Sequence, residues 1–251
     1  MRPMTLPSLV LLAACAPDAG ETLLVVGHDS ELDDPSAQRG MSTFTTIQDA
    51  IDAASSGDTV SVPAGTYTED VTMKSGVNVD GAGSAETYIV GTVTFTGAIA
   101  DTTLSDLSLV DATWYATRTR YTTNGVTVEG GYATLDGVGL YYFNLGVYAN
   151  AADSVALSNV TLGYNWYGAY SANSDSFEMY NSLVGSNPAG GVAVSGGQGA
   201  KIIHNDFIAN SFSATAAYLV GAVALADADS AYDWVVANNI ITSNYYGLDL
   251  Y

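Results

Sequence analysis

Short apolar runs, separated by glycine, asparagine, serine or aspartate, recur along the second half of the chain. Within each run apolar and polar residues alternate with a period of two, which is typical of strands with one buried face. New repeats start at positions 125, 146, 168, 191, 222 and 247, so successive starts are 21, 22, 23, 31 and 25 residues apart. This regular spacing of short strands predicts a solenoid.

The fold class predicted from this pattern is an all-β, right-handed parallel β-helix. One repeat, bent at three corners, makes one coil, and successive coils hydrogen-bond about 4.8 Å apart. Residues at equivalent positions of successive coils then stack on one another. One inward column is predicted at Val126, Val147, Ala169, Val192, Val223 and Leu248.

Asparagines recur with the same spacing and are expected at the corners. Asparagine suits a corner because it tolerates the left-handed conformation and its amide can bond to the next coil. The first predicted ladder contains Asn144, Asn165, Asn187, Asn210 and Asn244. The second, six residues earlier in each coil, contains Asn159, Asn181, His204 and Asn238. The alternative register would bury Lys201, so we expect Lys201 to point outward.

The charge balance narrows the classes of function. The chain has 26 acidic and 6 basic residues and a net charge of −20. This excludes a typical nucleic-acid-binding protein, which needs clustered lysine and arginine. The 251 residues are expected to form one elongated domain, because a solenoid grows by adding coils. No apolar run of about 18 residues occurs, so no membrane-spanning helix is expected.

Residues 1–15 have the pattern of a bacterial secretion signal, with one basic residue followed by a short apolar stretch. Leu12-Ala-Ala-Cys15 resembles a lipobox, in which Cys15 would be acylated and would become the mature amino terminus. Cys15 is the only cysteine, so an intramolecular disulfide is impossible. The motif predicts a lipid-anchored protein of the bacterial cell envelope. An ordinary secretion signal, giving a secreted protein, is the alternative.

Residues 16–42 are predicted to be a tether and an acidic first segment, with a strand over residues 22–27. The acidic side chains of this segment are Asp29, Glu31, Asp33 and Asp34. They could hold Ca²⁺, since hard cations bind several oxygen ligands. Their spacing is not that of an EF-hand, and a solvated run of charges is the alternative. The β-helix itself is expected over residues 43–251.

A helix is predicted over about residues 45–56, at the start of the β-helix. Its apolar positions have the spacing of one helical face: Ile47, Ala50, Ile51 and Ala54. Thr45 or Thr46 can cap the beginning of the helix, and Gly57 can end it. Such a helix would cover the open apolar end of the solenoid, which would otherwise recruit other strands.

The segments around this helix resemble the amino-terminal cap and first coil of the pectin-lyase-like superfamily. They are Thr46-Ile-Gln-Asp-Ala-Ile51, Gly57-Asp58, Pro63-Ala-Gly-Thr-Tyr67-Thr-Glu69 and Asp80-Gly-Ala-Gly83. This superfamily includes pectin methylesterases, pectate lyases and many β-helix repeat proteins. The resemblance covers about residues 43–251 and implies the same β-helical fold.

The catalytic signatures of the superfamily's enzymes are incomplete in this chain. Asp206-Phe-Ile208 begins like an esterase motif, but Ala209-Asn210 follows, and the Arg-Pro-Trp segment of the esterases is missing. The Gly-His-Gly of polygalacturonases is missing too. A lyase would need an arginine or lysine base and a cation such as Ca²⁺ at the uronate carboxylate.

Two arginines, Arg118 and Arg120, lie in a predicted insertion over about residues 111–124, which interrupts the repeat. Loops on rigid scaffolds often carry function, so these arginines are candidate bases of a lyase. The alternative is that they pair with nearby acids such as Asp111 or Asp136.

Aromatic residues gather at the corner before each repeat glycine. Stacked rings suit the packing of a corner, and exposed rings can also stack on sugar faces. The candidate glycan-binding residues are Tyr164, Trp166, Tyr167, Tyr245 and Tyr246.

Two functions are consistent with these patterns. The first is a cell-envelope or secreted protein that presents a rigid surface for binding a glycan or another envelope component. The alternative is a uronate polysaccharide lyase, which should bring carboxylates together beside Arg118 and Arg120. The coil that begins at Gly247 shows no capping segment, so either the natural chain is longer or this end pairs with another copy. We expect the isolated protein to self-associate through the carboxyl end.

Overall fold

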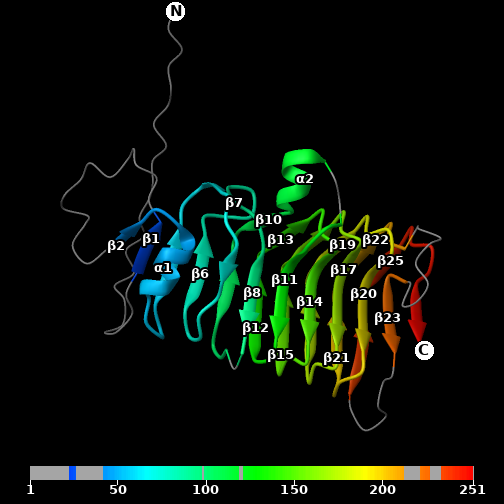
Figure 1. Ribbon diagram of the computed structural model, residues 1–251. Coiled ribbons are helices and arrows are strands. Elements are labelled where there is room, and N and C mark those ends of the chain that lie inside the picture. Colours follow the sequence, from blue (N-terminus) through cyan, green and yellow to red (C-terminus); the bar gives the residue numbers. More distant parts are fainter. Residues whose placement is uncertain are drawn as a thin grey trace, which may run out of the picture.

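The computed structural model describes residues 23–26, 42–97, 99–118, 121–211, 221–226 and 233–250. Its strands form three long parallel sheets that wind into a single solenoid (Figure 1). Sheets B and C contain eight strands each, one for every coil, and sheet A contains ten. The predicted all-β parallel solenoid with a short capping helix is therefore confirmed.

Each coil contributes one strand to each sheet, in the order A, B, C. Sheet A contains β2 (Ser42–Phe44), β1 (Leu23–Val26), β3 (Thr59–Val62), β6 (Asn78–Gly81), β9 (Thr103–Ser105), β12 (Tyr132–Asp136), β15 (Ser154–Ser158), β18 (Phe177–Tyr180), β21 (Ala200–Ile203) and β24 (Trp234–Ala237). Sheet B contains β4 (Gly65–Tyr67), β7 (Thr87–Val90), β10 (Ser108–Val110), β13 (Gly139–Tyr141), β16 (Thr161–Gly163), β19 (Leu183–Gly185), β22 (Asp206–Ile208) and β25 (Ile240–Thr242). Sheet C contains β5 (Val71–Thr72), β8 (Val93–Thr96), β11 (Asn124–Glu129), β14 (Leu145–Asn150), β17 (Tyr167–Ala172), β20 (Gly190–Ser195), β23 (Val223–Ala226) and β26 (Leu248–Leu250).

The core is built from stacked inward columns. The register of sheet C pairs the predicted column in order, from Val126 through Val147, Ala169, Val192 and Val223 to Leu248. All of these side chains are buried except Leu248, which belongs to the last coil. The glycine that starts most repeats lets neighbouring coils approach, since a Cβ at Gly168 would lie 2.5 Å from the carbonyl oxygen of Gly191.

The first asparagine ladder is present between sheets B and C, with one correction. The backbone N–H groups of Asn165, Asn187 and Asn210 each donate to the side-chain Oδ1 of the next ladder asparagine, at 2.7 to 3.2 Å, and Asn244 is the last member. The prediction for Asn144 was wrong, because the buried Phe143 occupies its position.

Phe143 donates its backbone N–H to Asn165 Oδ1 at 2.9 Å. Asn144 instead bonds to Asn124 at 3.4 Å, outside the ladder. A ladder residue must follow a corner residue with positive φ, and that corner residue here is Tyr142 (φ 71°). The ladder position is therefore 143, although no polar side chain stands there to extend the ladder.

The second ladder was also predicted one residue too early. Asn159, Asn181, His204 and Asn238 are exposed corner residues with φ between 50° and 60°. The buried ladder lies immediately after them. In it, Val160 donates to Ser182 Oγ, Ser182 donates to Asn205 Oδ1, and Asn205 donates to Asn239 Oδ1. The corner pair His204–Asn238 makes a separate contact of 3.1 Å on the surface.

The helix α1 (Ile47–Ala53) packs against the first coil and is fastened at both ends. Thr46 caps its beginning, and the Glu69 carboxylate accepts hydrogen bonds from the N–H groups of Ile47 and Gln48, both at 3.0 Å. The Lys74 ammonium donates to the last carbonyl groups. The last helical residue is Ala53, so the helix ends earlier than predicted. The backbone of Ala54 is extended, and Gly57 lies in the turn that follows.

The strand predicted over residues 22–27 is β1, which pairs between β2 and β3 and so joins sheet A ahead of residue 43. Lys201 points outward as predicted. None of the helices that the structure describes is long and apolar enough to cross a membrane.

Candidate functional site

The predicted insertion carries a short helix, α2 (Ala112–Thr117), that stands out from the side of the solenoid (Figure 1). The buried Asp111 fixes both ends of this insertion. Its carboxylate accepts the N–H of Trp114 at 2.7 Å and the hydroxyl groups of Thr122 and Thr123 at 3.1 and 2.5 Å. The insertion is therefore held to the corner between sheets B and C.

A column of stacked groups runs from α2 onto this corner. The Arg118 guanidinium lies 4.4 Å from the centre of the Trp114 ring, and Trp114 stacks on Tyr142 at 3.5 Å with an angle of 9° between the planes. Tyr142 in turn stacks on Tyr164 at 5.6 Å and 20°. We call these four residues the α2 stack. Arginine over an aromatic ring is a favourable cation–π contact.

The two inner rings of the α2 stack have no face left for a ligand. Trp114 is covered by Arg118 on one face and by Tyr142 on the other, and Tyr142 lies between Trp114 and Tyr164. These rings pack α2 against the solenoid. Tyr164 ends the column and is 47% exposed. Among the described residues no ring other than Tyr142 stacks on it, so its face away from Tyr142 is the one available to a ligand.

Other aromatic side chains surround the stack. Trp166 lies 5.4 Å from Tyr121, and Tyr167 lies 6.4 Å from Tyr170, which stacks on Tyr148 across sheet C. The structure thus brings three of the predicted glycan-binding residues, Tyr164, Trp166 and Tyr167, to one corner.

Tyr245 and Tyr246 lie elsewhere along the same corner. They contact each other edge-on at 4.7 Å on the last coil. The ladder from Asn165 to Asn244 passes through three strand spacings, which is about 14 Å at 4.8 Å per strand. These two tyrosines therefore form a separate group.

The carboxylates predicted as partners of Arg118 are engaged in other contacts. Asp111 binds the insertion, and Asp136 accepts from Ser158 and Asn159 at 2.7 and 2.6 Å. The single ion pair in the described part of the chain joins Lys201 and Glu178. Among the described residues, no carboxylate cluster of the kind expected of a lyase lies beside Arg118. Arg120 lies outside the described residues.

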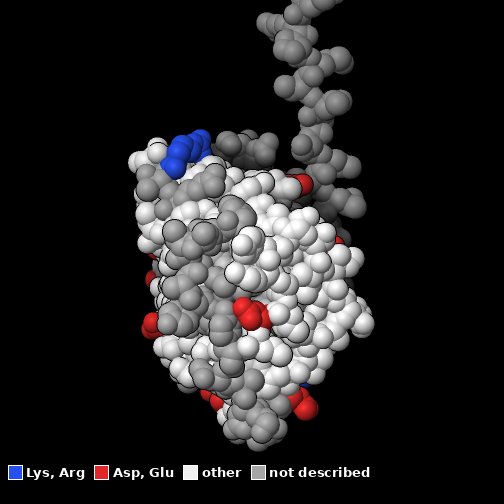
Figure 2. Space-filling view, turned by 90° about the vertical axis from the view of Figure 1, so that its right-hand side faces the viewer, with Lys and Arg blue, Asp and Glu red and all other residues white. Residues whose placement is uncertain are grey.

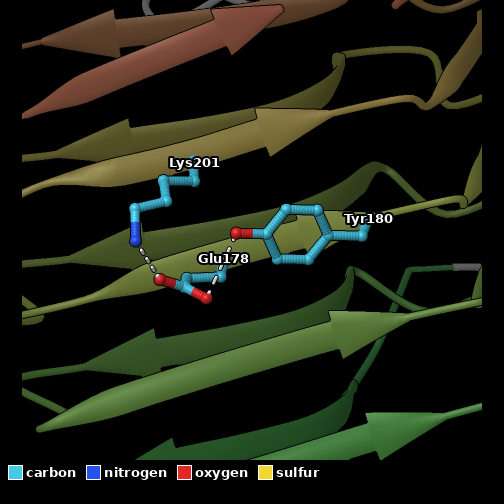
Figure 3. A network of polar contacts seen from close by, with 3 residues as sticks. All are labelled: Glu178, Tyr180 and Lys201. Atoms are coloured by element: carbon cyan, nitrogen blue, oxygen red, sulfur yellow. Dashed lines mark hydrogen bonds and ion pairs between the residues drawn. The ribbon is translucent and has the colours of Figure 1, made fainter.

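The outer face of sheet A carries a polar network formed by Glu178, Tyr180 and Lys201 (Figure 3). The Lys201 ammonium donates to Glu178 Oε1 at 2.8 Å, and the Tyr180 hydroxyl donates to Oε2 at 3.3 Å. Partial burial and the Glu178 carboxylate raise the pKa of Tyr180, while the hydrogen bond and charge of Glu178 raise the pKa of Lys201. Both shifts keep the protons in place, so neither Tyr180 nor Lys201 is a base near neutral pH.

Three carboxylates lie at the carboxyl ends of successive strands of the same sheet, at Asp80, Asp106 and Asp136. Ser105 donates to Asp80 Oδ1 at 2.6 Å. In the described ranges no three histidine, cysteine, aspartate or glutamate side chains come together in a way that could hold a metal ion. These three carboxylates form a polar surface on which their negative charges repel one another.

The substitution Asp106→Asn is expected to raise the melting temperature at neutral pH. Partial burial first, and then the charges of Asp80 and Asp136, raise the pKa of Asp106. The folded state thus binds the proton more tightly than the unfolded chain. The contribution of Asp106 to stability is complete below its unfolded-state pKa and is lost as the pH rises through the folded-state pKa. Thermal melts should show the gain at neutral pH and none in acid, and an unchanged or lower neutral melting temperature would contradict the shift.

Similar solved structures share the solenoid. A protein of Geobacillus virus E2, ORF18, has 18% identity and a TM-score of 0.55 over 72% of this chain and 44% of its own. A pectin methylesterase in complex with a hexasaccharide has 12% identity and a TM-score of 0.52 over 88% of this chain and 71% of its own. The catalytic domain of a GH87 α-1,3-glucanase has 12% identity and a TM-score of 0.47, over 77% and 37%.

These likenesses show the fold alone. The predicted right-handed coil is consistent with these β-helix proteins. No model of a known protein family matches the chain, and no curated protein matches it in sequence. The chain spans less than half the length of the viral protein. Asp206-Phe-Ile208, which begins like an esterase motif, is the ordinary strand β22 with Phe207 in the core.

Sequence reasoning did not identify Trp114 and Tyr121 as part of the site. The signal for Trp114 was its position four residues before Arg118, which is the spacing of side-chain neighbours on a helix. Cys15 and the acidic residues Asp29, Glu31, Asp33 and Asp34 lie outside the described residues, so the lipid anchor and the Ca²⁺ site stay predictions.

Proposed function

We propose that this protein binds a polysaccharide at the corner beside α2, with Tyr164 as the platform for a sugar ring. The observation that carries the proposal is the α2 stack, which ends in an open aromatic face on a rigid corner. Residues on a rigid scaffold lose little conformational freedom when a ligand binds, which favours affinity.

The surroundings of Tyr164 suit a sugar better than an apolar ligand. An aromatic face contacts the C–H groups of a sugar ring, and polar groups around it bind the hydroxyl groups. Seen from the end of the last coil, most of the described side chains are neither acidic nor basic, and a basic group stands out at the upper left (Figure 2). A pectin methylesterase of similar fold holds a hexasaccharide, which supports a ligand of this class.

Binding is favoured over catalysis by the engagement of Arg118. Its guanidinium rests on Trp114, and no described carboxylate pairs with it. Arginine is also a poor base, because it stays protonated at ordinary pH. A lyase acting on polygalacturonate or alginate would generate unsaturated uronates with new ultraviolet absorbance. We expect no such absorbance, and turnover that is lost on replacing Arg118 or Arg120 would establish the lyase.

The variant Tyr164→Ala is expected to lose at least about tenfold in affinity, which corresponds to about 1.4 kcal/mol. The reason is the loss of the one open face of the α2 stack. Binding would be measured by affinity electrophoresis in mannan, soluble cellulose fragments, polygalacturonate and alginate, followed by calorimetry with the best of them.

The matched control is Tyr132→Ala, since Tyr132 is 50% exposed at the start of β12, in sheet A, away from α2. It should bind as the wild type does. Equal losses in the two variants, or wild-type protein that binds none of the four polysaccharides, would contradict the proposed function.

A further inference from the structure

The rings of the α2 stack have a defined orientation relative to the solenoid. Trp114, Tyr142 and Tyr164 come from three successive coils, and neighbouring planes differ by only 9° and 20°. Because successive coils stack along the solenoid axis, the normals of these rings follow that axis. The open face of Tyr164 therefore looks along the axis, toward the next coil.

In the described part of the next coil, the residue equivalent to Tyr164 is small and places no ring on this face. Tyr142, Tyr164, Ser186 and Ala209 directly follow Tyr141, Gly163, Gly185 and Ile208, which pair in register along sheet B. All four have positive φ, from 54° to 71°. The column thus changes from tyrosine to serine after Tyr164, so the space that a third tyrosine ring would take is not filled by a ring of this column.

We propose that one pyranose ring occupies this space, stacked on Tyr164 and lying over Ser186, and that the polysaccharide crosses the coils instead of following the solenoid axis. This inference rests on the proposed function. A sugar ring stacked on Tyr164 lies parallel to the tyrosine ring, and therefore perpendicular to the solenoid axis. A chain joined through equatorial bonds extends close to the plane of its rings, so it runs around the coil from sheet B toward sheet C.

The direction of the polysaccharide chain decides which of the candidate residues it can contact. The chain would pass Leu183, which is exposed on sheet B in the same coil as Ser186. Tyr245 and Tyr246, on the last coil, would make no contact with it. A chain running along the axis would instead use Tyr164 and these two tyrosines together.

The test is Ser186→Tyr, which extends the ring column by one coil. Tyr142 and Tyr164 already adopt this backbone conformation, so the added ring should be tolerated and should close the open face of Tyr164. We expect at least tenfold weaker binding to the tightest-binding of the four polysaccharides. The matched control is Ser243→Tyr, which has the same conformation (φ 56°) on the last coil and should bind normally. Thermal melts check that both variants fold.

A second variant tests the direction without adding bulk. The double substitution Tyr245→Ala and Tyr246→Ala should leave affinity within about twofold of the wild type. Normal binding by Ser186→Tyr, or a tenfold loss in the double variant, would overturn the inference. If Tyr164→Ala weakens binding while Ser186→Tyr does not, the proposed function survives and only the placement of the sugar fails. If no polysaccharide binds the wild type, both fail.

Discussion

Replacing Asn187 with alanine is expected to lower the free energy of unfolding by about 2 to 4 kcal/mol, since a buried polar group left unpaired costs about 1 to 3 kcal/mol and a lost hydrogen bond about 1 kcal/mol more. Asn187 is fully buried. Its Oδ1 accepts the N–H of Asn165 at 2.9 Å, and its Nδ2 donates to the carbonyl of Leu162 at 3.0 Å. Alanine leaves the N–H of Asn165 unpaired inside the corner and removes the side-chain bond to the Leu162 carbonyl.

The control for this prediction is Asn144→Ala, at a corner asparagine outside the ladder. Asn144 makes one long side-chain bond, to Asn124. Its replacement should change the free energy of unfolding by less than about 0.5 kcal/mol, the usual range for surface positions. Equilibrium denaturation in urea measures both values. Similar losses in the two variants would show that the ladder has been misplaced.

The second large effect is expected for Trp114→Ala, which should weaken polysaccharide binding by about tenfold or more, or about 1.4 kcal/mol. Trp114 covers the face of Tyr142 that points away from Tyr164, so its removal leaves Tyr164 backed by an unsupported ring. Stability should change little, because α2 stands outside the solenoid core (Figure 1). Calorimetric titration and urea denaturation separate the two effects.

Tyr115→Ala is the matched control on the same helix. Tyr115 is 53% exposed and is next to Trp114 in the chain. Its replacement should leave binding unchanged. A loss equal to that of Trp114→Ala would mean that the helix itself, and not the stack, supports the ligand.

The repeat could be predicted from the sequence because every coil obeys the same local rule. Alternation with a period of two identifies the strands, and the spacing of the repeat glycines gives the register that the structure confirms from Val126 to Leu248. Asn144 and the second ladder were predicted at the wrong positions because asparagine suits two adjacent corner positions. It tolerates positive φ, as at Asn181, and it also fills the buried ladder site, as at Asn205.

The candidate site could be predicted only in part. Tyr164 and Arg118 stood out by residue type and by their place at a corner and in an insertion. Their connection depends on Trp114 and Tyr142, which are 28 residues apart in the chain (142 − 114) and stack only once the coils are wound. Whether a ring face is open or covered is also a property of the neighbouring coils, so the sequence could not separate packing rings from a binding face.

The central claim is that a sugar ring binds the open face of Tyr164, and a structure of the protein with an oligosaccharide of the tightest-binding polysaccharide tests it most directly. The account predicts a pyranose ring in contact with Tyr164, at about 4 Å, above Ser186 and with its chain crossing the coils. An oligosaccharide bound along the outer face of sheet A, beside Asp136 and Glu178, with the face of Tyr164 empty, would contradict it.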